Sequence, residues 1–267
     1  PSPALEDWEK FVQRVIHPKH KVTIAVAGKY IELQDAYKSI YESLIHAGAH
    51  HDTKVQIVRV EAEAIEDHGA KSVIGDVDGI LVPGGFGDRG TAGKILAAKY
   101  ARENNIPYFG ICLGMQIATI EYARNVCGLK GANSTEFDKT TKHPVICLQE
   151  EQKGVEDMGA TMRLGSSESI LFTGTKAADL YGNLDRIHER HRHRYEFNSD
   201  YQDRLQDAGL VISSVSAEEG LVEIVELPEH PFYLGAQFHP EFQSKPNHPH
   251  PLFSGFVAAA LEHSQKH

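Results

Sequence analysis

Hydrophobic positions along the first half of the chain follow two periods, and they predict strands that alternate with helices. Short apolar runs typical of buried strands occupy residues 22–27, 55–60, 78–82 and 107–111. Apolar residues at helical spacing or helix-compatible runs predict helices over residues 34–47, 91–103 and 115–124. This alternation indicates right-handed βαβ units and a mostly parallel central sheet flanked by helices.

The second half of the chain has a different pattern. Strand-like runs follow one another closely at residues 144–149, 161–164, 169–172, 210–215, 221–227 and 232–238. We expect them to add antiparallel strands to the edge of the sheet. Helices are predicted over residues 199–208 and 251–263. Residues 21–267 are therefore expected to form one α/β domain with three layers.

Residues 1–20 are interpreted as a separate segment. Apolar residues spaced three or four apart predict an amphipathic helix over residues 3–16, and His17-Pro18-Lys19-His20 interrupts it. We interpret residues 1–20 as a linker helix that leads from an upstream domain. The alternative is an ordinary first helix of the same domain.

Composition and charge narrow the class of protein. Hydrophobic residues make up 41 % and charged residues 24 % of the chain, as in ordinary globular proteins. The net charge of −10 argues against a nucleic-acid partner. Three cysteines without a CxxC pair indicate a reducing compartment, here the cytoplasm, and disfavour a structural zinc site. No apolar run is long enough to predict a membrane span.

The strongest chemical signal is a Gly-x-Cys-x-Gly sequence around Cys112, where an apolar run gives way to a helix-compatible run. That order resembles a nucleophile elbow, in which a sharp strand-to-helix turn exposes a reactive side chain. A helix N-terminus would also favour the thiolate form. The alternative is a structural cysteine in a strand-to-helix turn.

A cysteine nucleophile needs a base, and the base needs a group that orients it. His239-Pro240-Glu241 follows a predicted buried strand, so an extended turn would project His239 and Glu241 to the same side. Acyl transfer also needs donors for the developing oxyanion. The candidates are the backbone amides of Gly85, in a Pro-Gly-Gly loop after a strand, and of Leu113. Taken singly, His-Pro-Glu is typical of a surface turn and Gly-Gly of a chain reversal.

These three features, in this order, resemble the class I glutamine amidotransferases. Further stretches resemble the CTP synthase glutaminase domains within that class, over about residues 20–260. They are Gly28-Lys29-Tyr30, the loop 83–90, Asn133-Ser134-Thr135-Glu136-Phe137, Thr161-Met162-Arg163-Leu164-Gly165 and Glu189-Arg190-His191-Arg192-His193-Arg194-Tyr195-Glu196.

The resemblance implies that Cys112 attacks the side-chain amide of L-glutamine, with His239 as base and Glu241 as its orienting group. Ammonia would leave, and water would hydrolyse the glutamyl thioester. The resemblance also implies substrate binding by Phe86, Gln116, Glu136 and Arg194. In the family, residues at the positions of Gln116 and Glu136 hold the α-amino group, and the residue at Arg194 pairs with the α-carboxylate. The charges of Glu136 and Arg194 suit these two roles.

The resemblance further implies that the ammonia is used to convert UTP to CTP in an N-terminal amidoligase domain, which would bind ATP and Mg²⁺. No cofactor or metal is expected in the present chain, which lacks a phosphate-binding Gly-x-x-x-x-Gly-Lys-[Ser/Thr] loop. GTP would act as an allosteric activator through a lid at residues 86–90, with a response that involves Arg89, Thr161 and Arg163. The full-length enzyme would be a homo-oligomer, a tetramer.

Other interpretations of these residues are kept for comparison. His188, His191 and His193 suggest a metal site, but three interleaved arginines would repel a cation. The glutaminase could serve another class I enzyme, such as GMP synthetase. A non-catalytic module of the same fold that senses glutamine or GTP is a further alternative.

Overall fold

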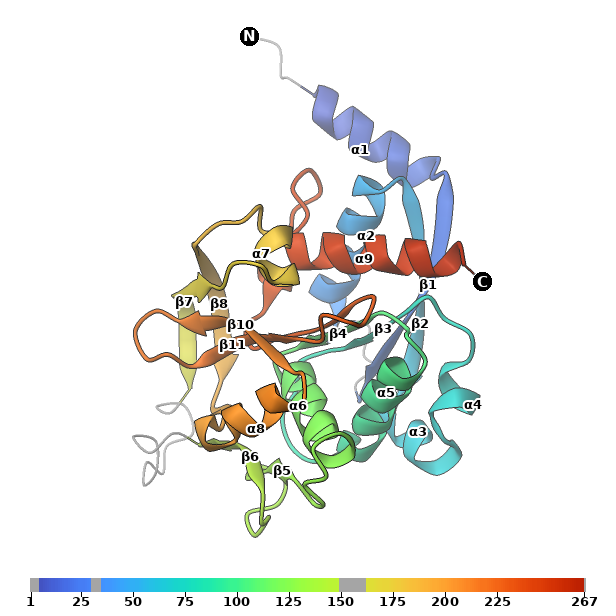
Figure 1. The fold of residues 1–267 in the computed structure, drawn as a ribbon. Coiled ribbons are helices and arrows are strands. Elements are labelled where there is room, and N and C mark those ends of the chain that lie inside the picture. The colour runs from blue at the N-terminus through green and yellow to red at the C-terminus, as the bar shows by residue number, and fades with distance from the viewer. Residues whose placement is uncertain (1–4, 30–34, 149–161, 267) are drawn as a thin grey trace.

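The computed structural model describes residues 5–29, 35–148 and 162–266. Within these residues the central sheet has nine strands in the order β2-β1-β3-β4-β12-β11-β10-β7-β8 (Figure 1). In that order the strands are β2 (Thr53–Glu61), β1 (His20–Gly28), β3 (Gly79–Val82), β4 (Tyr108–Ile111), β12 (Tyr233–Ala236), β11 (Val222–Glu226), β10 (Val211–Ser216), β7 (Arg163–Leu171) and β8 (Arg186–His193). A small second sheet contains β5 (Asn133–Ser134), β6 (Pro144–Leu148) and β9 (Tyr195–Phe197).

Helices cover both faces of the central sheet, as Figure 1 shows. They are α1 (Glu6–Ile16), α2 (Lys38–His50), α3 (Ala62–His68), α4 (Ala70–Ile74), α5 (Thr91–Glu103), α6 (Leu113–Asn125), α7 (Lys176–Leu180), α8 (Gln202–Asp207) and α9 (Pro251–Ser264). The described residues also contain two 3₁₀ turns, η2 (Ser199–Tyr201) and η3 (Pro240–Phe242).

Two hydrophobic cores lie on opposite faces of the sheet because side chains alternate along each strand. In β1, Ile24 and Val26 belong to the core under α2 and α9, whereas Ala25 and Ala27 belong to the core under α5 and α6. Successive strands β1, β3 and β4 pair in parallel, and α5 connects the last two. The predicted three-layer α/β architecture is therefore confirmed.

Three details of the sheet differ from the expectation. Residues 232–238 were expected at the antiparallel edge, but β12 lies in the middle of the sheet, parallel to β4 and antiparallel to β11. The expected strands 161–164 and 169–172 correspond, in the described residues, to one strand, β7. The polar residues between them remain in the ladder because β7 pairs with β8 through eight consecutive positions. β8 itself was not predicted, since its alternation is of charged and buried polar residues.

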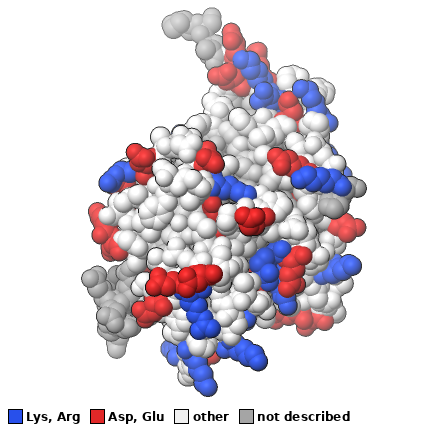
Figure 2. Space-filling view, in the orientation of Figure 1, with Lys and Arg blue, Asp and Glu red and all other residues white. Residues whose placement is uncertain are grey.

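Helix α1 extends away from the body of the molecule in Figure 1. It carries a row of exposed apolar side chains, Trp8, Val12, Val15 and Ile16, of which Ile16 is 59 % exposed. In the described residues no helix combines the length and the apolar character that a membrane crossing requires. Acidic and basic side chains are interspersed over the face shown in Figure 2, without a continuous basic surface.

Candidate active site

Cys112 stands between β4 and α6 in a strained backbone conformation. Its φ of 52° is positive, a backbone conformation that glycine adopts readily and that side-chain-bearing residues other than asparagine and aspartate rarely adopt. The glycines on either side, Gly110 and Gly114, make the turn possible because neighbouring backbone atoms lie where a Cβ would be. A Cβ added at Gly110 would lie 2.5 Å from the carbonyl oxygen of Gly114, and one at Gly114 would lie 2.1 Å from that of Val82. This geometry is that of a nucleophile elbow.

His239 and Glu241 form a hydrogen-bonded pair beside Cys112. His239 Nδ1 lies 2.7 Å from Oε1 of Glu241, and both residues are buried. The turn was expected to be extended, but residues 240–242 form the 3₁₀ turn η3. Burial lowers the pKa of His239, but the Cys112 thiol and then Glu241 raise it to about 10. The imidazole is therefore stabilised in its protonated form between the sulfur of Cys112 and the carboxylate of Glu241.

The two predicted oxyanion donors lie on either side of the cysteine. Leu113 is the first residue of α6, where a backbone amide has no partner inside the helix. Gly84 and Gly85 follow β3, and a Cβ added at Gly84 would lie 3.5 Å from the Cβ of Cys112. Gly85 packs against the side chain of Leu113, with 3.5 Å between Leu113 Cδ2 and an added Cβ. Gly85 and Leu113 therefore lie next to each other close to Cys112, and their amides remain the candidates for binding an oxyanion there.

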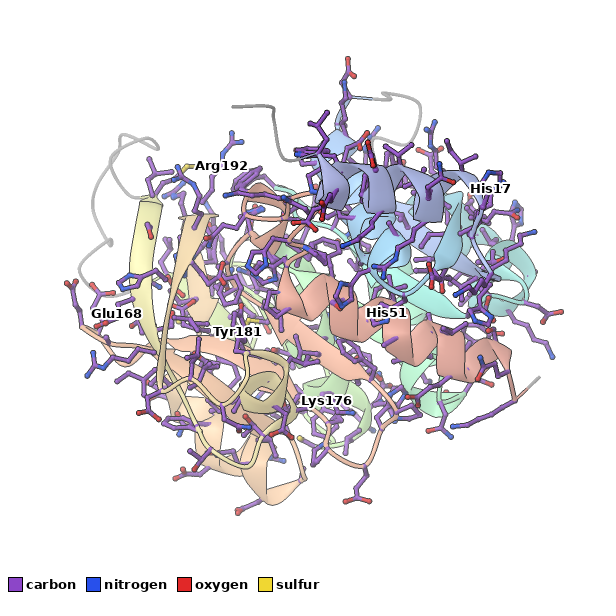
Figure 3. All side chains as sticks on the ribbon, turned by 90° about the horizontal axis from the view of Figure 1, so that it is seen from above. His17, His51, Glu168, Lys176, Tyr181 and Arg192 are labelled. Carbon is purple, nitrogen blue, oxygen red and sulfur yellow. The ribbon has the colours of Figure 1, made fainter. Side chains whose placement is uncertain are left out.

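A pocket of about 200 Å³ opens next to these residues. Its lining includes Gly84, Gly85, Phe86, Cys112, Arg192, His239 and Glu241, together with residues at the start of α2. Arg192 lies at the end of β8 in Figure 3, and its guanidinium stands 5.9 Å from the centroid of the Phe86 ring. Gln116, Glu136 and Arg194 do not line this pocket.

The predicted substrate-binding residues Glu136 and Arg194 lie within electrostatic reach of each other behind the loop 86–90. Oε1 of Glu136 accepts a hydrogen bond of 2.7 Å from the backbone amide of Gly87. Burial raises the pKa of Glu136, and the Gly87 hydrogen bond and the charges of Lys29 and Arg194 oppose that rise. A carboxylate and a guanidinium therefore lie near each other beside this loop, outside the lining of the pocket next to Cys112.

The loop 86–90 is attached to the end of β1. Lys29 Nζ donates to the carbonyl oxygen of Phe86, and Arg89 Nη2 donates to that of Lys29 at 2.7 Å. Arg89 also faces Glu63, with 3.8 Å between Nε and Oε2. Two of the residues in this loop, Phe86 and Arg89, were singled out from the sequence.

Arg163 lies at the start of β7 and not in the loop 86–90 that contains Arg89. It forms an ion pair of 2.5 Å with Glu223, whose other oxygen lies 2.7 Å from Nε2 of His191. Thr161, the remaining residue of the expected GTP response, lies outside the described residues. His191 and His193 point to the buried face of β8, and Arg190 and Arg192 to the exposed face. No group of three or more potential metal ligands occurs in the part of the chain that the structure describes.

The His-Arg-His-Arg-Tyr-Glu stretch reaches the site through its backbone. The carbonyl oxygen of Arg190 accepts a 2.8 Å hydrogen bond from the amide of His239. The carbonyl oxygen of Arg192 lies 4.0 Å from Cys112 Sγ, and that of Tyr195 accepts from Gln116 Nε2 at 3.0 Å. β8 and β9 therefore fix the base, the nucleophile and a predicted substrate-binding residue at once.

Two further residues near the site were not predicted from the sequence. Gln237 is fully buried, and its Nε2 lies 3.7 Å from Cys112 Sγ. Lys94 on α5 is also fully buried, and its Nζ lies 3.9 Å from a Cβ added at Gly85. In the sequence Gln237 is a polar residue inside the apolar run 232–238, two positions before His239, and this pattern does not reveal its contact with Cys112.

Comparison with known proteins gives a family match over most of the chain. The family model "Glutamine amidotransferase class-I" matches residues 32–259. A CTP synthase of Syntrophus aciditrophicus is 54 % identical over 265 residues, which are 99 % of this chain and 49 % of that protein. A CTP synthase of Methanocaldococcus jannaschii is 54 % identical over 266 residues, 97 % of this chain and 49 % of that protein. The chain thus spans about half the length of the curated relatives it matches.

Solved structures agree with these matches. The glutaminase domain of Trypanosoma brucei CTPS, described with bound acivicin, superposes with a TM-score of 0.84 and is 42 % identical. The match covers 90 % of this chain and 94 % of that domain. A glutamine amidotransferase from Thermotoga maritima, with a TM-score of 0.51 and 11 % identity, shares the fold alone.

Proposed function

The chain belongs to the class I glutamine amidotransferases and, within them, to the CTP synthase glutaminase domains, and from this premise we propose that it hydrolyses L-glutamine to glutamate and ammonia at Cys112. The observation that carries the proposal is the arrangement of three residues. A strained cysteine stands at an elbow, and the His239–Glu241 pair lies beside it with 2.7 Å between Nδ1 and Oε1. A structural cysteine would not require this geometry.

The proposed reaction has two halves. The Cys112 sulfur attacks the side-chain amide carbon, and the amides of Gly85 and Leu113 stabilise the negative charge that develops on the carbonyl oxygen. Collapse of this intermediate breaks the C–N bond, and the protonated His239 delivers its proton to the departing ammonia. Water, deprotonated by the now neutral His239, then attacks the thioester carbon and releases glutamate and the Cys112 thiolate.

Residues around the loop 86–90 are proposed to select the substrate. Glu136 and Gln116 would hold the α-amino group, Arg194 would pair with the α-carboxylate, and Phe86 would cover the side chain. The half-buried Glu136 has one oxygen engaged by the Gly87 amide, so its other oxygen can accept from an ammonium group. Arg194 offers a forked donor set that matches a carboxylate.

We further propose that the ammonia aminates UTP to CTP in an amidoligase domain of a longer chain, as the name of the matched relatives suggests. ATP and Mg²⁺ would bind in that domain, and the reaction would take place in the cytoplasm. The exposed apolar row of α1 is proposed to pack against the amidoligase domain, which would bury it. A homotetramer of the long chain is part of the same proposal.

Activation by GTP is proposed to act through the loop 86–90. Arg89 links this loop to Lys29 and Glu63 on neighbouring elements, so a nucleotide that binds Arg89 would change how the loop is held. Arg163 lies on β7, not in this loop, and its guanidinium is already paired with Glu223. Arg89→Ala is therefore expected to reduce GTP activation more than Arg163→Ala.

Selective labelling of Cys112 tests the proposed hydrolysis. A glutamine-mimicking diazo-ketone should modify Cys112 and leave the other two cysteines, Cys127 and Cys147, unmodified. Acivicin, which occupies the T. brucei glutaminase domain, should protect Cys112 from this label. Peptide mass spectrometry that finds no label on Cys112 would contradict the proposal and favour a non-catalytic module.

A further inference from the structure

Gln237 occupies a position in the active site that the mechanism above does not use. It follows β12 directly, between Ala236 and Phe238, and its side chain is completely buried. Its backbone amide donates to the carbonyl oxygen of Glu223 at 2.8 Å, which holds it to the neighbouring strand β11. A buried amide side chain needs partners for its own donor and acceptor groups.

The Gln237 side chain has two partners within the site. Its Nε2 lies 3.7 Å from Sγ of Cys112, and its Oε1 lies 3.2 Å from Nε2 of Gln116. Gln116 Nε2 in turn lies 3.0 Å from the carbonyl oxygen of Tyr195. The contacts form a continuous chain from a backbone carbonyl, through two side-chain amides, to the nucleophile.

The direction of this chain follows from its first member. A backbone carbonyl can only accept a hydrogen bond, so the NH₂ group of Gln116 must face Tyr195. The second N–H of the same NH₂ group then donates to an oxygen, which must be Oε1 of Gln237. The NH₂ group of Gln237 is left facing the sulfur of Cys112. Tyr195 thereby fixes a donor, rather than an acceptor, at the nucleophile.

A donor at this place distinguishes the two forms of the cysteine. A thiolate is a strong hydrogen-bond acceptor, whereas a thiol sulfur accepts only weakly. A hydrogen bond to the charged form favours that form. The carbonyl oxygen of Arg192, 4.0 Å from the same sulfur, has the opposite preference because it can accept the proton of a thiol.

We propose that Gln237 is a further catalytic residue, which donates a hydrogen bond to Cys112 Sγ and stabilises the thiolate, and that Gln116 is a positioning residue that orients it. The hydrogen bond strengthens as the thiolate forms and is restored when the thioester is hydrolysed. The proposal rests on the proposed function only in taking Cys112 as the nucleophile. His239, which is hydrogen-bonded to Glu241, is a titratable group that interacts with the same sulfur atom as Gln237.

The test measures the rate at which iodoacetamide alkylates Cys112 as a function of pH, because this reagent reacts with thiolate and does not need the glutamine site. Gln237→Met keeps the length of the side chain and removes the donor. Loss of a hydrogen bond to a charged group should lower the alkylation rate at neutral pH by on the order of tenfold and move its midpoint to higher pH. Cys127 in the same sample serves as an internal reference, and Gln206→Met on α8 is the matched substitution at an exposed glutamine.

A double-substitution cycle tests the role of Gln116. Gln116→Met should reproduce the slower alkylation, and the effect should disappear in the Gln237→Met background if Gln116 acts through Gln237. If Gln237→Met does not fold by thermal unfolding, Gln237→Glu keeps the shape and places an acceptor at the sulfur, which should slow alkylation further. A folded Gln237 variant with the wild-type rate and midpoint would overturn the proposal.

The two proposals fail in distinguishable ways. If glutamine hydrolysis is absent but the alkylation midpoint moves as described, the donor role of Gln237 stands and the assigned reaction is wrong. If hydrolysis occurs but the midpoint does not move in any folded variant, the reaction stands and the role of Gln237 is wrong.

Discussion

His239 Nδ1 lies 2.7 Å from Glu241 Oε1 across a 3₁₀ turn, so the base and its orienting carboxylate are held together by local backbone geometry. Gln243, directly after this turn, donates to Glu189 at 2.6 Å and to the carbonyl oxygen of His188 at 2.8 Å. The turn is thereby tied to β8 at both ends, since the amide of His239 donates to Arg190. The pair is preorganised before substrate binds.

Glu241→Gln is expected to abolish most of the glutaminase activity without unfolding the chain. The amide keeps the size of the carboxylate but no longer stabilises the imidazolium or fixes its tautomer. By analogy with other triads, kcat should fall on the order of 10²- to 10⁴-fold. Steady-state ammonia release measures the effect, and circular dichroism checks the fold. A variant with wild-type kcat would show that Glu241 does not orient the base.

Cys112→Ser should lower the pKa of His239. Cys112 has the largest of the influences that raise this pKa to about 10. In the serine variant burial still lowers the pKa of His239, and Glu241 still raises it. NMR titration of the His239 ring should give a midpoint well below that of the wild type. If the midpoint stays near 10 in the serine variant, the cysteine and the histidine do not form an ion pair.

The same pKa gives a sign for stability against pH. A histidine whose pKa is raised by folding, from 6.5 to about 10, stabilises the fold fully below pH 6.5, and the contribution is lost as the pH rises to 10. The difference in unfolding free energy between wild type and Cys112→Ser should therefore shrink over this interval. Chemical denaturation at pH 6 and pH 10 measures it, and a difference that grows with pH would contradict the ion pair.

Lys94→Met is expected to stabilise the protein at neutral pH. Burial, and then the nearby Lys29 and Arg89, lower the pKa of Lys94 from 10.5 to about 8. Within the described residues its Nζ also has no hydrogen-bond partner. The charged amine therefore destabilises the fold below pH 8 by about 3 kcal/mol, and this cost fades as the pH rises to 10.5.

The measurement is the unfolding free energy of both chains at pH 7 and pH 10.5. The methionine variant should be more stable at pH 7, with a smaller difference at pH 10.5. Lys99→Met, on the same helix but half-exposed, is the matched control and should change little at either pH. A gain for Lys94→Met that does not depend on pH would show that the amine is not held in a destabilised charged form.

Gly84→Ala and Gly85→Ala are expected to have unequal effects on catalysis. An added Cβ at Gly84 would lie 2.9 Å from Cε1 of His239, whereas one at Gly85 meets Leu113 at an ordinary 3.5 Å. Displacement of the imidazole by the first change should reduce kcat roughly 10²-fold, since small misplacements of a reacting group are costly. Gly85→Ala keeps its backbone amide and should be much milder. Equal effects on kcat would contradict the described packing of the loop.

The order of strands and helices in the first half of the chain could be predicted because apolar periodicity there is strong. The helix predicted over residues 91–103 has those bounds in the structure. The predicted position of β12 was wrong because the pattern of apolar residues within a strand does not tell which other strand it pairs with. Its parallel pairing with β4 is a long-range contact. β8 was missed because most of its buried positions are polar. Glu189, His191 and His193 gain partners only in the folded chain.

The candidate site was predictable where chemistry is carried by short motifs. Cys112, His239 and Glu241 could be named from residues near strand ends, and the structure places them together. Gln237 and Lys94 could not, because their importance depends on what surrounds a buried polar atom. Gln237 meets Cys112 only through the pairing of β12 with β4, and Lys94 meets Gly85 only through the packing of α5.

The most direct test of the central claim compares the formation of glutamate and ammonia from L-glutamine by the wild-type chain and by Cys112→Ala. Exogenous ammonia is the control substrate, used with the proposed longer protein. The account predicts that the wild type forms glutamate and ammonia in equal amounts and that Cys112→Ala forms neither, while the use of exogenous ammonia is unaffected. Glutamate formation by Cys112→Ala at the wild-type rate would contradict the account.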